Sequence, residues 1–167
     1  DEGLLKYYGV AVWNGFISDR TDELLSLEKL VECAKKVGGE NHRFQYIQLP
    51  FNMAKTAPYT LPTQKVKGEE CTILQAAYRL KIGVISSSSL LQRKLFQKPF
   101  SAEVGVILDD TMTIKDDVGL ALQFVRSTPT IVSSLFGSIV PKHIKENCEI
   151  AKVKVVPKAK YDLLYKL

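Results

Sequence analysis

The sequence predicts an α/β protein in which parallel strands alternate with helices. Four apolar runs recur along the chain, beginning near residues 6, 44, 82 and 131, and a helical pattern follows each of them. Strands that alternate with helices are typical of a parallel sheet covered by helices. Periodicity leaves two architectures open, an open doubly wound sheet and half of an eight-stranded barrel.

The first unit consists of an apolar run over residues 6–13 and the helix that follows it. Ser26 is a candidate N-cap for this helix, and Gly38 and Gly39 predict its end. The apolar positions of the helix recur at the spacing of a single helical face. They are Leu27, Leu30, Val31 and Ala34.

The second unit begins with a strand over residues 44–49, which Pro50 ends. Prolines at 58 and 62 predict a loop over residues 55–68. Acidic side chains are favourable at a helix N-terminus, so we expect the next helix to open with Glu69 and Glu70. The side chains that this helix is expected to bury are Ile73, Leu74, Ala77 and Leu80.

The third strand is predicted over residues 82–85 and runs into four serines at 86–89. A helical turn over residues 90–95 and, after a polar stretch, a helix over 115–126 are expected to follow. The apolar stripe of that helix consists of Val118, Ala121, Leu122 and Val125.

The fourth strand is predicted over residues 131–136, with a turn at Gly137–Ser138. The next helix has Pro141 at or near its first position, where the missing N–H costs nothing. We expect its inner face to consist of Ile144, Cys148 and Ala151. A last amphipathic segment over residues 158–167 is expected to pack on the outside.

Length and composition predict one domain over residues 1–167. The hydrophobic content of 46% is enough for a core, whereas a complete (β/α)8 barrel typically needs about 250 residues. The net charge of +5 is spread along the chain. This favours an ordinary solvated surface over a positive rim that attracts a phosphorylated cofactor. The basic residues neither cluster nor interleave with aromatic ones, so we expect no nucleic-acid partner.

Three cysteines, Cys33, Cys71 and Cys148, form an odd set without C-x-x-C spacing. We expect buried thiols in a reducing compartment rather than a metal site or a disulfide framework. The sequence shows neither a signal peptide nor an apolar run that could span a bilayer. We therefore expect a soluble cytoplasmic protein without membrane contact.

Functional groups of a parallel sheet gather at the carboxyl ends of its strands. Gln48 and Asn52 at the end of the second strand can hold a carboxamide or a sugar hydroxyl, or satisfy the backbone of a loop. His42 precedes that strand and lies at the wrong end for catalysis. The serines at 86–89 have no base obviously placed beside them, so we interpret them as small polar groups that line a cleft.

The turn at Gly137–Ser138 precedes a helix N-terminus, where free N–H groups and the helix dipole favour phosphate. Ser138 can add a hydroxyl, and Lys142 or His143 can add charge. An ordinary turn between a strand and a helix is the alternative interpretation.

Five segments in the expected order resemble the aldo-keto reductase family. Residues 7–13 (YYGVAVW) are similar to the fifth strand of the family and residues 47–52 (IQLPFN) to the sixth. Residues 85–92 (ISSSSLLQ) resemble the seventh strand and its loop, and residues 122–127 (LQFVRS) the helix that leads into the eighth strand. The segment similar to the family's adenosine-phosphate clamp contains Gly137, Ser138, Pro141, Glu146 and Asn147.

The resemblance implies half of a TIM-type (β/α)8 barrel, strands 5–8, and an NADP-dependent oxidoreductase acting on a carbonyl substrate. It implies that Gln48 lies near the nicotinamide carboxamide and that Ser87 occupies the position of a ring that stacks on nicotinamide. It also implies that Ser88 and Leu90 lie along the pyrophosphate. The residues implied around the adenosine end of the cofactor are Ser138, His143, Glu146 and Asn147. Of these, Ser138 and His143 are implied to lie nearest the extra phosphate of NADP.

The chain departs from the family at several of these positions. Ala11 and Val12 stand where many members hold the carboxamide with Ser-Asn, Ser87 replaces the stacking ring, and His143 replaces the usual basic residue. The family's Asp-Tyr-Lys-His tetrad comes from the first half of the barrel, so no catalytic residue is assigned in this chain. No metal ligand is assigned either.

We therefore expect the chain to be inactive alone. Its expected partner is an N-terminal half-barrel chain or a second copy of itself. The alternative is a non-catalytic half-barrel that self-associates as a scaffold or an interaction protein.

Overall fold

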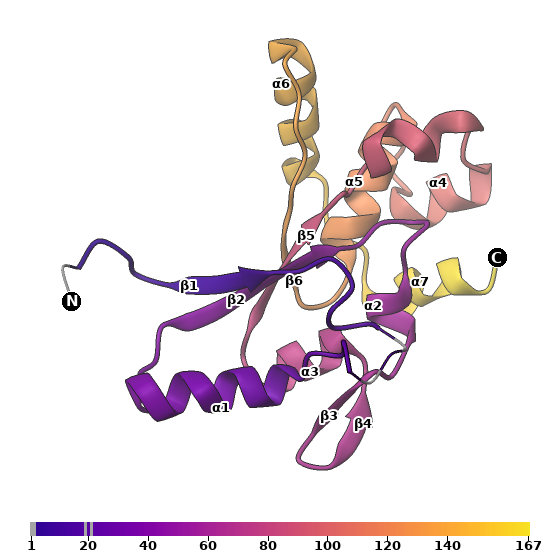
Figure 1. Cartoon of the computed structure of the whole chain (residues 1–167). Coiled ribbons are helices and arrows are strands. Elements are labelled where there is room, and N and C mark those ends of the chain that lie inside the picture. The colour runs from indigo at the N-terminus through magenta and orange to yellow at the C-terminus, as the bar shows by residue number, and fades with distance from the viewer. Residues whose placement is uncertain (1–2, 19, 21) are drawn as a thin grey trace.

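The computed structural model describes residues 3–18, 20 and 22–167 of the chain. Its centre is a four-stranded sheet in the order β1–β2–β5–β6, in which every neighbouring pair is parallel (Figure 1). The strands are β1 (Tyr8–Ala11), β2 (Phe44–Pro50), β5 (Gly83–Ser87) and β6 (Ile131–Ser134). Their order in the sheet follows their order in the chain, so the predicted parallel α/β fold is confirmed.

Helix α1 (Leu27–Gly38) connects β1 to β2 as expected. The Ser26 side chain accepts a hydrogen bond from the Lys29 N–H at 3.3 Å, and Gly39 ends the helix with a φ of 66°. The helix buries a stripe of Leu27, Val31 and Ala34. Cys33 lies beside this stripe and is exposed, so the expectation of a buried thiol is wrong at this position.

The segment between β2 and the next long helix differs from the prediction. Instead of a loop over residues 55–68, the chain forms helix α2 (Ala57–Thr60) and an antiparallel hairpin of β3 (Gln64–Val66) and β4 (Glu69–Cys71). Lys67 and Gly68 form its two-residue turn with φ angles of 53° and 83°, because a tight hairpin turn requires the left-handed region at both positions. Glu69 and Glu70 therefore belong to a strand and do not open a helix.

Helix α3 (Ile73–Arg79) begins after that hairpin, with Thr72 as its N-cap. The Thr72 hydroxyl accepts a hydrogen bond from the Gln75 N–H at 3.2 Å, and Gln75 Oε1 accepts one from the Thr72 N–H at 2.9 Å. This reciprocal pair satisfies donors that the helix leaves free. The predicted positions Ile73, Leu74 and Ala77 are buried, and Leu80 is partly buried against the core.

Two helices lie between β5 and β6, besides the short 3-10 helix η1 (Leu91–Gln97) at the expected helical turn. Helix α4 (Ala102–Leu108) was not predicted; Ser101 caps it by accepting a hydrogen bond from the Val104 N–H at 3.4 Å. Helix α5 (Asp117–Ser127) begins two residues later than expected, after its N-cap Asp116. Its predicted positions Ala121, Leu122 and Val125 are buried, and Val118 is half-buried.

Helix α6 (Pro141–Glu149) has Pro141 in its first turn as predicted. The structure describes every residue of this helix, and none of them is buried. Ile144, Cys148 and Ala151 are exposed, so their expected inner face is wrong. The physical reason is the position of α6 after β6, an edge strand with no further strand beside it to pack against.

The chain ends in η2 (Ile150–Lys152), α7 (Lys158–Tyr161) and η3 (Asp162–Tyr165). The segment over residues 158–167 was expected on the outside, but it also enters the core. Tyr161 is completely buried, with its ring centre 5.2 Å from that of Phe124 and its hydroxyl 2.6 Å from that of Thr128. Burial raises the pKa of Tyr161 far above its usual range, so the phenol stays neutral.

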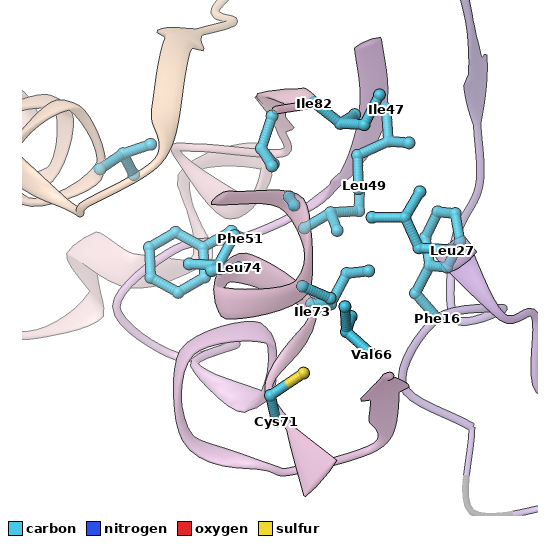
Figure 2. Close-up of a cluster of buried hydrophobic side chains, with 14 of the residues drawn as sticks. Phe16, Leu27, Ile47, Leu49, Phe51, Val66, Cys71, Ile73, Leu74 and Ile82 are labelled. Atoms are coloured by element: carbon cyan, nitrogen blue, oxygen red, sulfur yellow. The ribbon is translucent and has the colours of Figure 1, made fainter. Parts of the chain in front are cut away.

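The hydrophobic core lies between the helices and one face of the sheet (Figure 2). Ile47 and Leu49 of β2 lie in it near Leu27 of α1, and Ile73 of α3 closes the cluster from the side of the hairpin. Cys71 belongs to the same core, and burial raises the pKa of its thiol. The expected buried thiol is confirmed at this position, and all three cysteines are free.

Several described residues on the opposite face of the sheet remain accessible to solvent. Figure 1 shows α1 and α3 together below β1 and β2. On the other face Tyr46 keeps 36% of its surface exposed, and Gln48 and Ile85 beside it are half-buried. A doubly wound sheet carries helices on both faces, so the exposure of these side chains argues against that alternative.

Among the residues that are described, no helix combines the length and the apolar character that crossing a bilayer requires.

Candidate functional site

The carboxyl ends of the four strands meet at one edge of the sheet. The register places Ala11 of β1 beside Gln48 of β2, Gln48 beside Ile85 of β5, and Ile85 beside Ser133 of β6. Binding groups of parallel α/β folds lie at this edge. We therefore describe it as the candidate site.

Gln48 lies on the uncovered face of the sheet. Its neighbours Ile47 and Leu49 are buried in the core, and because side chains alternate along a strand, Gln48 points the other way. It lines a shallow cavity of about 270 Å³ together with Tyr46 and Ile85. Its amide is thus accessible, whereas Ala11 across the strand pair offers no hydrogen-bonding side chain.

Asn52 is used by the fold. Its Nδ2 donates to the Ser88 carbonyl at 2.9 Å, and its Oδ1 accepts from the N–H groups of Ala54 and Lys55 at 3.0 Å each. The side chain is completely buried. Of the two alternatives for this amide, the structure supports the satisfaction of loop backbone.

The buried serines join three strand ends. Ser86 donates to the Phe51 carbonyl at 2.8 Å and lies 3.3 Å from the Ser89 hydroxyl, to which Ser134 donates at 3.1 Å. Ser86 and Ser89 are buried, so they have a structural role in place of the cleft-lining role expected for them. The sequence signal was present in the unbroken serine run, but only the register shows which of its members point inward.

Ser87, Ser88 and Leu90 follow directly at the end of β5 and are half-buried. Ser88 has a φ of 55°, and Leu91, Gln92 and Arg93 have φ angles of 46°, 51° and 67°. Left-handed backbone costs a non-glycine residue roughly 1–2 kcal/mol, and it persists where surrounding contacts hold it. The Asn52 hydrogen bond to the Ser88 carbonyl is one such contact.

Ser138 and His143 lie at the start of α6. Ser138 Oγ accepts a hydrogen bond from the Val140 N–H at 3.1 Å, and His143 is exposed in the first turn. Glu146 lies one turn further on and pairs with Lys142 at 3.7 Å. Because both partners are largely exposed, this ion pair is weak, and Lys142 remains able to meet an anion.

Asn147 is half-buried on the side of α6 that faces α5 and β6. It lines a cavity of about 290 Å³ with Arg126, Ser133 and Phe136. Arg126 was not singled out as a site residue. Its guanidinium donates to the Val153 carbonyl at 2.7 Å, which holds the end of α5 to the segment after α6.

The predicted residues therefore form three groups at the carboxyl edge. Gln48 stands alone on the opposite face of the sheet. Ser87 ends β5, and Ser88 and Leu90 lie in the loop that follows it. The other four lie on the turn and helix after β6. The hydrogen bond between Ser134 and Ser89 joins the second group to the strand that carries the third. Within residues 3–18, 20 and 22–167, no cluster of His, Cys, Asp and Glu is arranged to hold a metal ion.

Known proteins resemble this chain in structure. No protein-family model and no curated protein matches the sequence. A thermostable aldo-keto reductase solved with the inhibitor epalrestat matches with a TM-score of 0.56 and 16% identity, over 98% of this chain and 49% of that one. An aldo-keto reductase from Bacillus halodurans in its apo form matches with a TM-score of 0.54 and 13% identity, over 96% of this chain and 62% of that one.

The chain has an aldo-keto reductase-like fold. A third similar structure is an aldo/keto reductase from Klebsiella pneumoniae in complex with NADP and acetate. It matches with a TM-score of 0.54 and 15% identity, over 97% of this chain and 58% of that one. The resemblance noted in the sequence is thus confirmed for the fold. The chain spans about half the length of the aldo-keto reductases it matches, between 49% and 62% in these three.

Proposed function

We propose that this chain is the cofactor-side half of an NADP-dependent oxidoreductase of the aldo-keto reductase type. The observation that carries the proposal is a four-stranded parallel sheet that buries one face in the core and leaves Tyr46 exposed on the other. In a (β/α)8 barrel the helices lie outside and the other face of the sheet lines the interior. The exposed face with Gln48 and Tyr46 corresponds to that interior, and the four strands to strands 5–8.

A second half-barrel completes the protein in this proposal. Among the described residues, β1 and β6 each pair with a single strand, and an unpaired parallel edge favours the addition of another strand. Four further β/α units, as an N-terminal half-barrel, pair with both edges and cover the uncovered face. They supply the catalytic acid for a carbonyl substrate, and no residue of this chain is assigned that role.

The residues of this chain fit NADP at two places. Gln48 has an accessible amide that can orient a carboxamide, and α6 presents Lys142 and His143 beside its N-terminus, which favours phosphate. NADP supplies the hydride when it is bound. Ala11 and Ser87 make the nicotinamide end a looser fit, because neither can replace the groups that many family members place there.

Trp13 offers a direct test of cofactor binding. It is the only tryptophan of the chain, lies two residues after β1 at the carboxyl edge, and is 66% exposed. A dihydronicotinamide near Gln48 is expected to quench Trp13 fluorescence by energy transfer. Titration of the purified chain with NADPH measures this, and the absence of saturable quenching would contradict the cofactor assignment.

Two variants test the contacts to the two ends of the cofactor separately. Gln48→Leu is expected to weaken NADPH and NADH alike by about tenfold, the effect of one lost hydrogen bond. Lys142→Gln combined with His143→Gln is expected to weaken NADPH and leave NADH unchanged, because only NADPH carries the extra phosphate. Lys65→Gln on the exposed hairpin is the matched control and should change neither affinity.

An aldehyde-reduction assay tests the proposed partner half-barrel. The chain alone is expected to reduce no aldehyde, and mixing it with a folded half-barrel of four N-terminal β/α units is expected to restore NADPH-dependent reduction. Persistent inactivity with such a partner, once stable association has been shown, would contradict the enzymatic proposal.

Exposed aromatic side chains favour a second candidate function. Tyr7 and Tyr8 are 42% and 48% exposed and line the same shallow cavity as Tyr46. In this alternative two copies cover each other's uncovered faces and form a non-catalytic scaffold. Sedimentation that shows only monomer at micromolar concentration would rule it out.

A further inference from the structure

Another cavity lies away from the strand-end edge. Its volume is about 680 Å³, within the usual range for small-molecule sites. It opens between α2, α3 and the C-terminal segment, and Pro129 and Thr130, just before β6, form part of its wall. These two residues place it toward the amino-terminal edge of the sheet, opposite the candidate cofactor site.

The cavity lies on the helix side of the two central strands. Helix α3 connects β2 to β5, whereas a completing half-barrel joins at the outer edges, β1 and β6. A partner at those edges therefore leaves the cavity open. For this reason the inference below does not rest on the proposed oxidoreductase function.

Three tyrosine rings contribute to its lining. Tyr59 and Tyr165 stack with ring centres 5.1 Å apart and planes 20° from parallel, and Tyr78 stands 77% exposed at the rim. Leu74 contributes an apolar surface from α3. Rings of this kind bind planar aromatic groups by stacking and edge contacts.

The charges around the cavity favour an anion. Arg79 and Lys158 are cations, and Asp162 is the one carboxylate among the lining residues. Asp162 is already occupied, because it accepts hydrogen bonds from the Tyr59 hydroxyl and from Lys158 Nζ, both at 2.5 Å. Burial raises the pKa of Tyr165 to about 12, so this wall adds no negative charge near neutral pH.

Arg79 is the cation that remains available. Its partner Glu69 lies 3.1 Å away and keeps 76% of its side chain exposed, so the pair is weak and a ligand can compete for it. The planar guanidinium can bind a carboxylate or sulfonate through two parallel hydrogen bonds.

We propose that this cavity is a second ligand site, which takes a small aromatic anion with its ring against Tyr78 and Leu74 and its acidic group on Arg79. The probe that tests it is naphthalene-2-carboxylate, and the neutral naphthalene-2-carboxamide has nearly the same shape. Isothermal titration of the whole chain is expected to show one saturable site for the carboxylate and at least about tenfold weaker binding of the carboxamide, because the charged hydrogen bonds are lost.

Variants locate the site. Arg79→Gln is expected to weaken the carboxylate about tenfold, and Tyr78→Ala several-fold through the lost ring contact. Both side chains are at the surface of α3, so circular dichroism should show an unchanged fold. Tyr7→Ala removes an exposed ring from the uncovered sheet face and serves as the control, with unchanged affinity expected.

Three results would overturn the proposal. These are the absence of saturable binding, equal affinity for carboxylate and carboxamide, and binding that Tyr7→Ala abolishes while Arg79→Gln leaves it intact. The last result would place the probe on the uncovered face of the sheet.

Discussion

Gln64 shows how much of the fold depends on one buried amide. Its Oε1 accepts a hydrogen bond from the Leu27 N–H at 3.0 Å, and its Nε2 donates to the carbonyls of Phe16 and Leu25 at 2.9 and 3.0 Å. The side chain thereby fastens the hairpin strand β3 to the loop after β1 and to the first residue of α1. That loop leads away from the candidate site, so Gln64 supports the site from a distance.

Gln64→Met keeps the volume of this side chain and removes its hydrogen bonds. We expect a loss of about 2–4 kcal/mol in the free energy of unfolding, because buried backbone groups are left without partners. Urea denaturation measures the loss. Gln97→Met at an exposed position is the control, and an equal change in both variants would contradict the role assigned to Gln64.

Asp109 is a nearly buried carboxylate that predicts a pH dependence. Burial by itself raises its pKa, but hydrogen bonds from the Thr111 hydroxyl and from the N–H groups of Ile114 and Thr111 outweigh this and hold the pKa below its ordinary value. A carboxyl with a lowered pKa in the folded state stabilises the fold above the unfolded pKa of about 3.9. That stability is lost as the pH falls through the lower folded pKa.

Asp109→Asn tests this dependence. At pH 6 the variant is expected to melt below the natural chain, because the charged hydrogen bonds are weakened. The difference should shrink as the pH falls from about 5 toward 3, because the carboxyl of the unfolded chain takes up its proton there, and the loss is complete only below the lowered pKa of the folded state. Thermal melts at several pH values measure it, and a difference that stays constant over this range would contradict the assignment. Asp22→Asn, at a surface ion pair, is the control.

At the scale of elements, the strand pair β1–β2 depends on a glycine. A Cβ on Gly9 would lie 2.1 Å from the Tyr46 carbonyl oxygen, which belongs to the backbone and cannot move aside. The sequence placed Gly9 in a strand, but it gave no sign of this close approach, which comes from the register between two segments far apart in the chain.

Gly9→Ala is therefore expected to lower the free energy of unfolding by about 2 kcal/mol or more, through overpacking against the backbone. Gly105→Ala in α4 is the matched control: a Cβ there meets nothing within 4 Å. Because alanine is the better helix former, this control should raise stability by about 0.5–1 kcal/mol. Equal effects of the two substitutions in chemical denaturation would show that the contact at Gly9 is unimportant.

Helix prediction succeeded where several local signals agreed and failed where strand pairing or a weak apolar pattern decided the outcome. Helix α1 has a cap, an apolar stripe and terminal glycines in one stretch of sequence, and it formed as expected. Glu69 and Glu70 satisfy the rule for a helix start, but pairing with Gln64–Val66 places them in a strand. Helix α4 was missed because the stretch after residue 95 was interpreted as a polar connection, and the buried side chains of the helix, Ile107 and Leu108, lie only at its end.

For the whole molecule, the sheet order predicts how stability is distributed. β2 and β5 each pair with two strands, whereas β1 and β6 are edges. Local opening is easier where fewer contacts must break. The backbone amides of β2 and β5 are therefore expected to exchange most slowly with deuterium, and those of β1 to exchange faster.

Hydrogen exchange followed by NMR measures this order directly. The fourth helix of the sequence, α4, packs near α5 and serves as a reference for amides outside the sheet. Equal protection of β1 and β2 in the isolated chain would show that the edge is already covered, for example by a second copy. Protection of β1 that rises with protein concentration would support the self-associating alternative.

The sequence by itself determined the four β/α units, the parallel sheet and the resemblance to aldo-keto reductases. These depend on apolar periodicity, caps and strand-end residues, all of which are local in the chain. The tertiary structure decided which of the strand-end polar groups are free. Asn52, Ser86 and Ser89 are engaged in hydrogen bonds with loops and strand ends, whereas Gln48 remains accessible on the opposite face of the sheet.

The tertiary structure also determined which apolar faces are buried and which parts of the sheet stay exposed. The stripe on α6 was expected to pack inward but is exposed, and the C-terminal segment buries Tyr161 in the core. An amphipathic pattern shows that one face of a helix is apolar, but it does not show which surface that face packs against. That depends on the order of the strands in space, which within the described chain leaves two edges of the sheet unpaired and Tyr46 exposed on one of its faces.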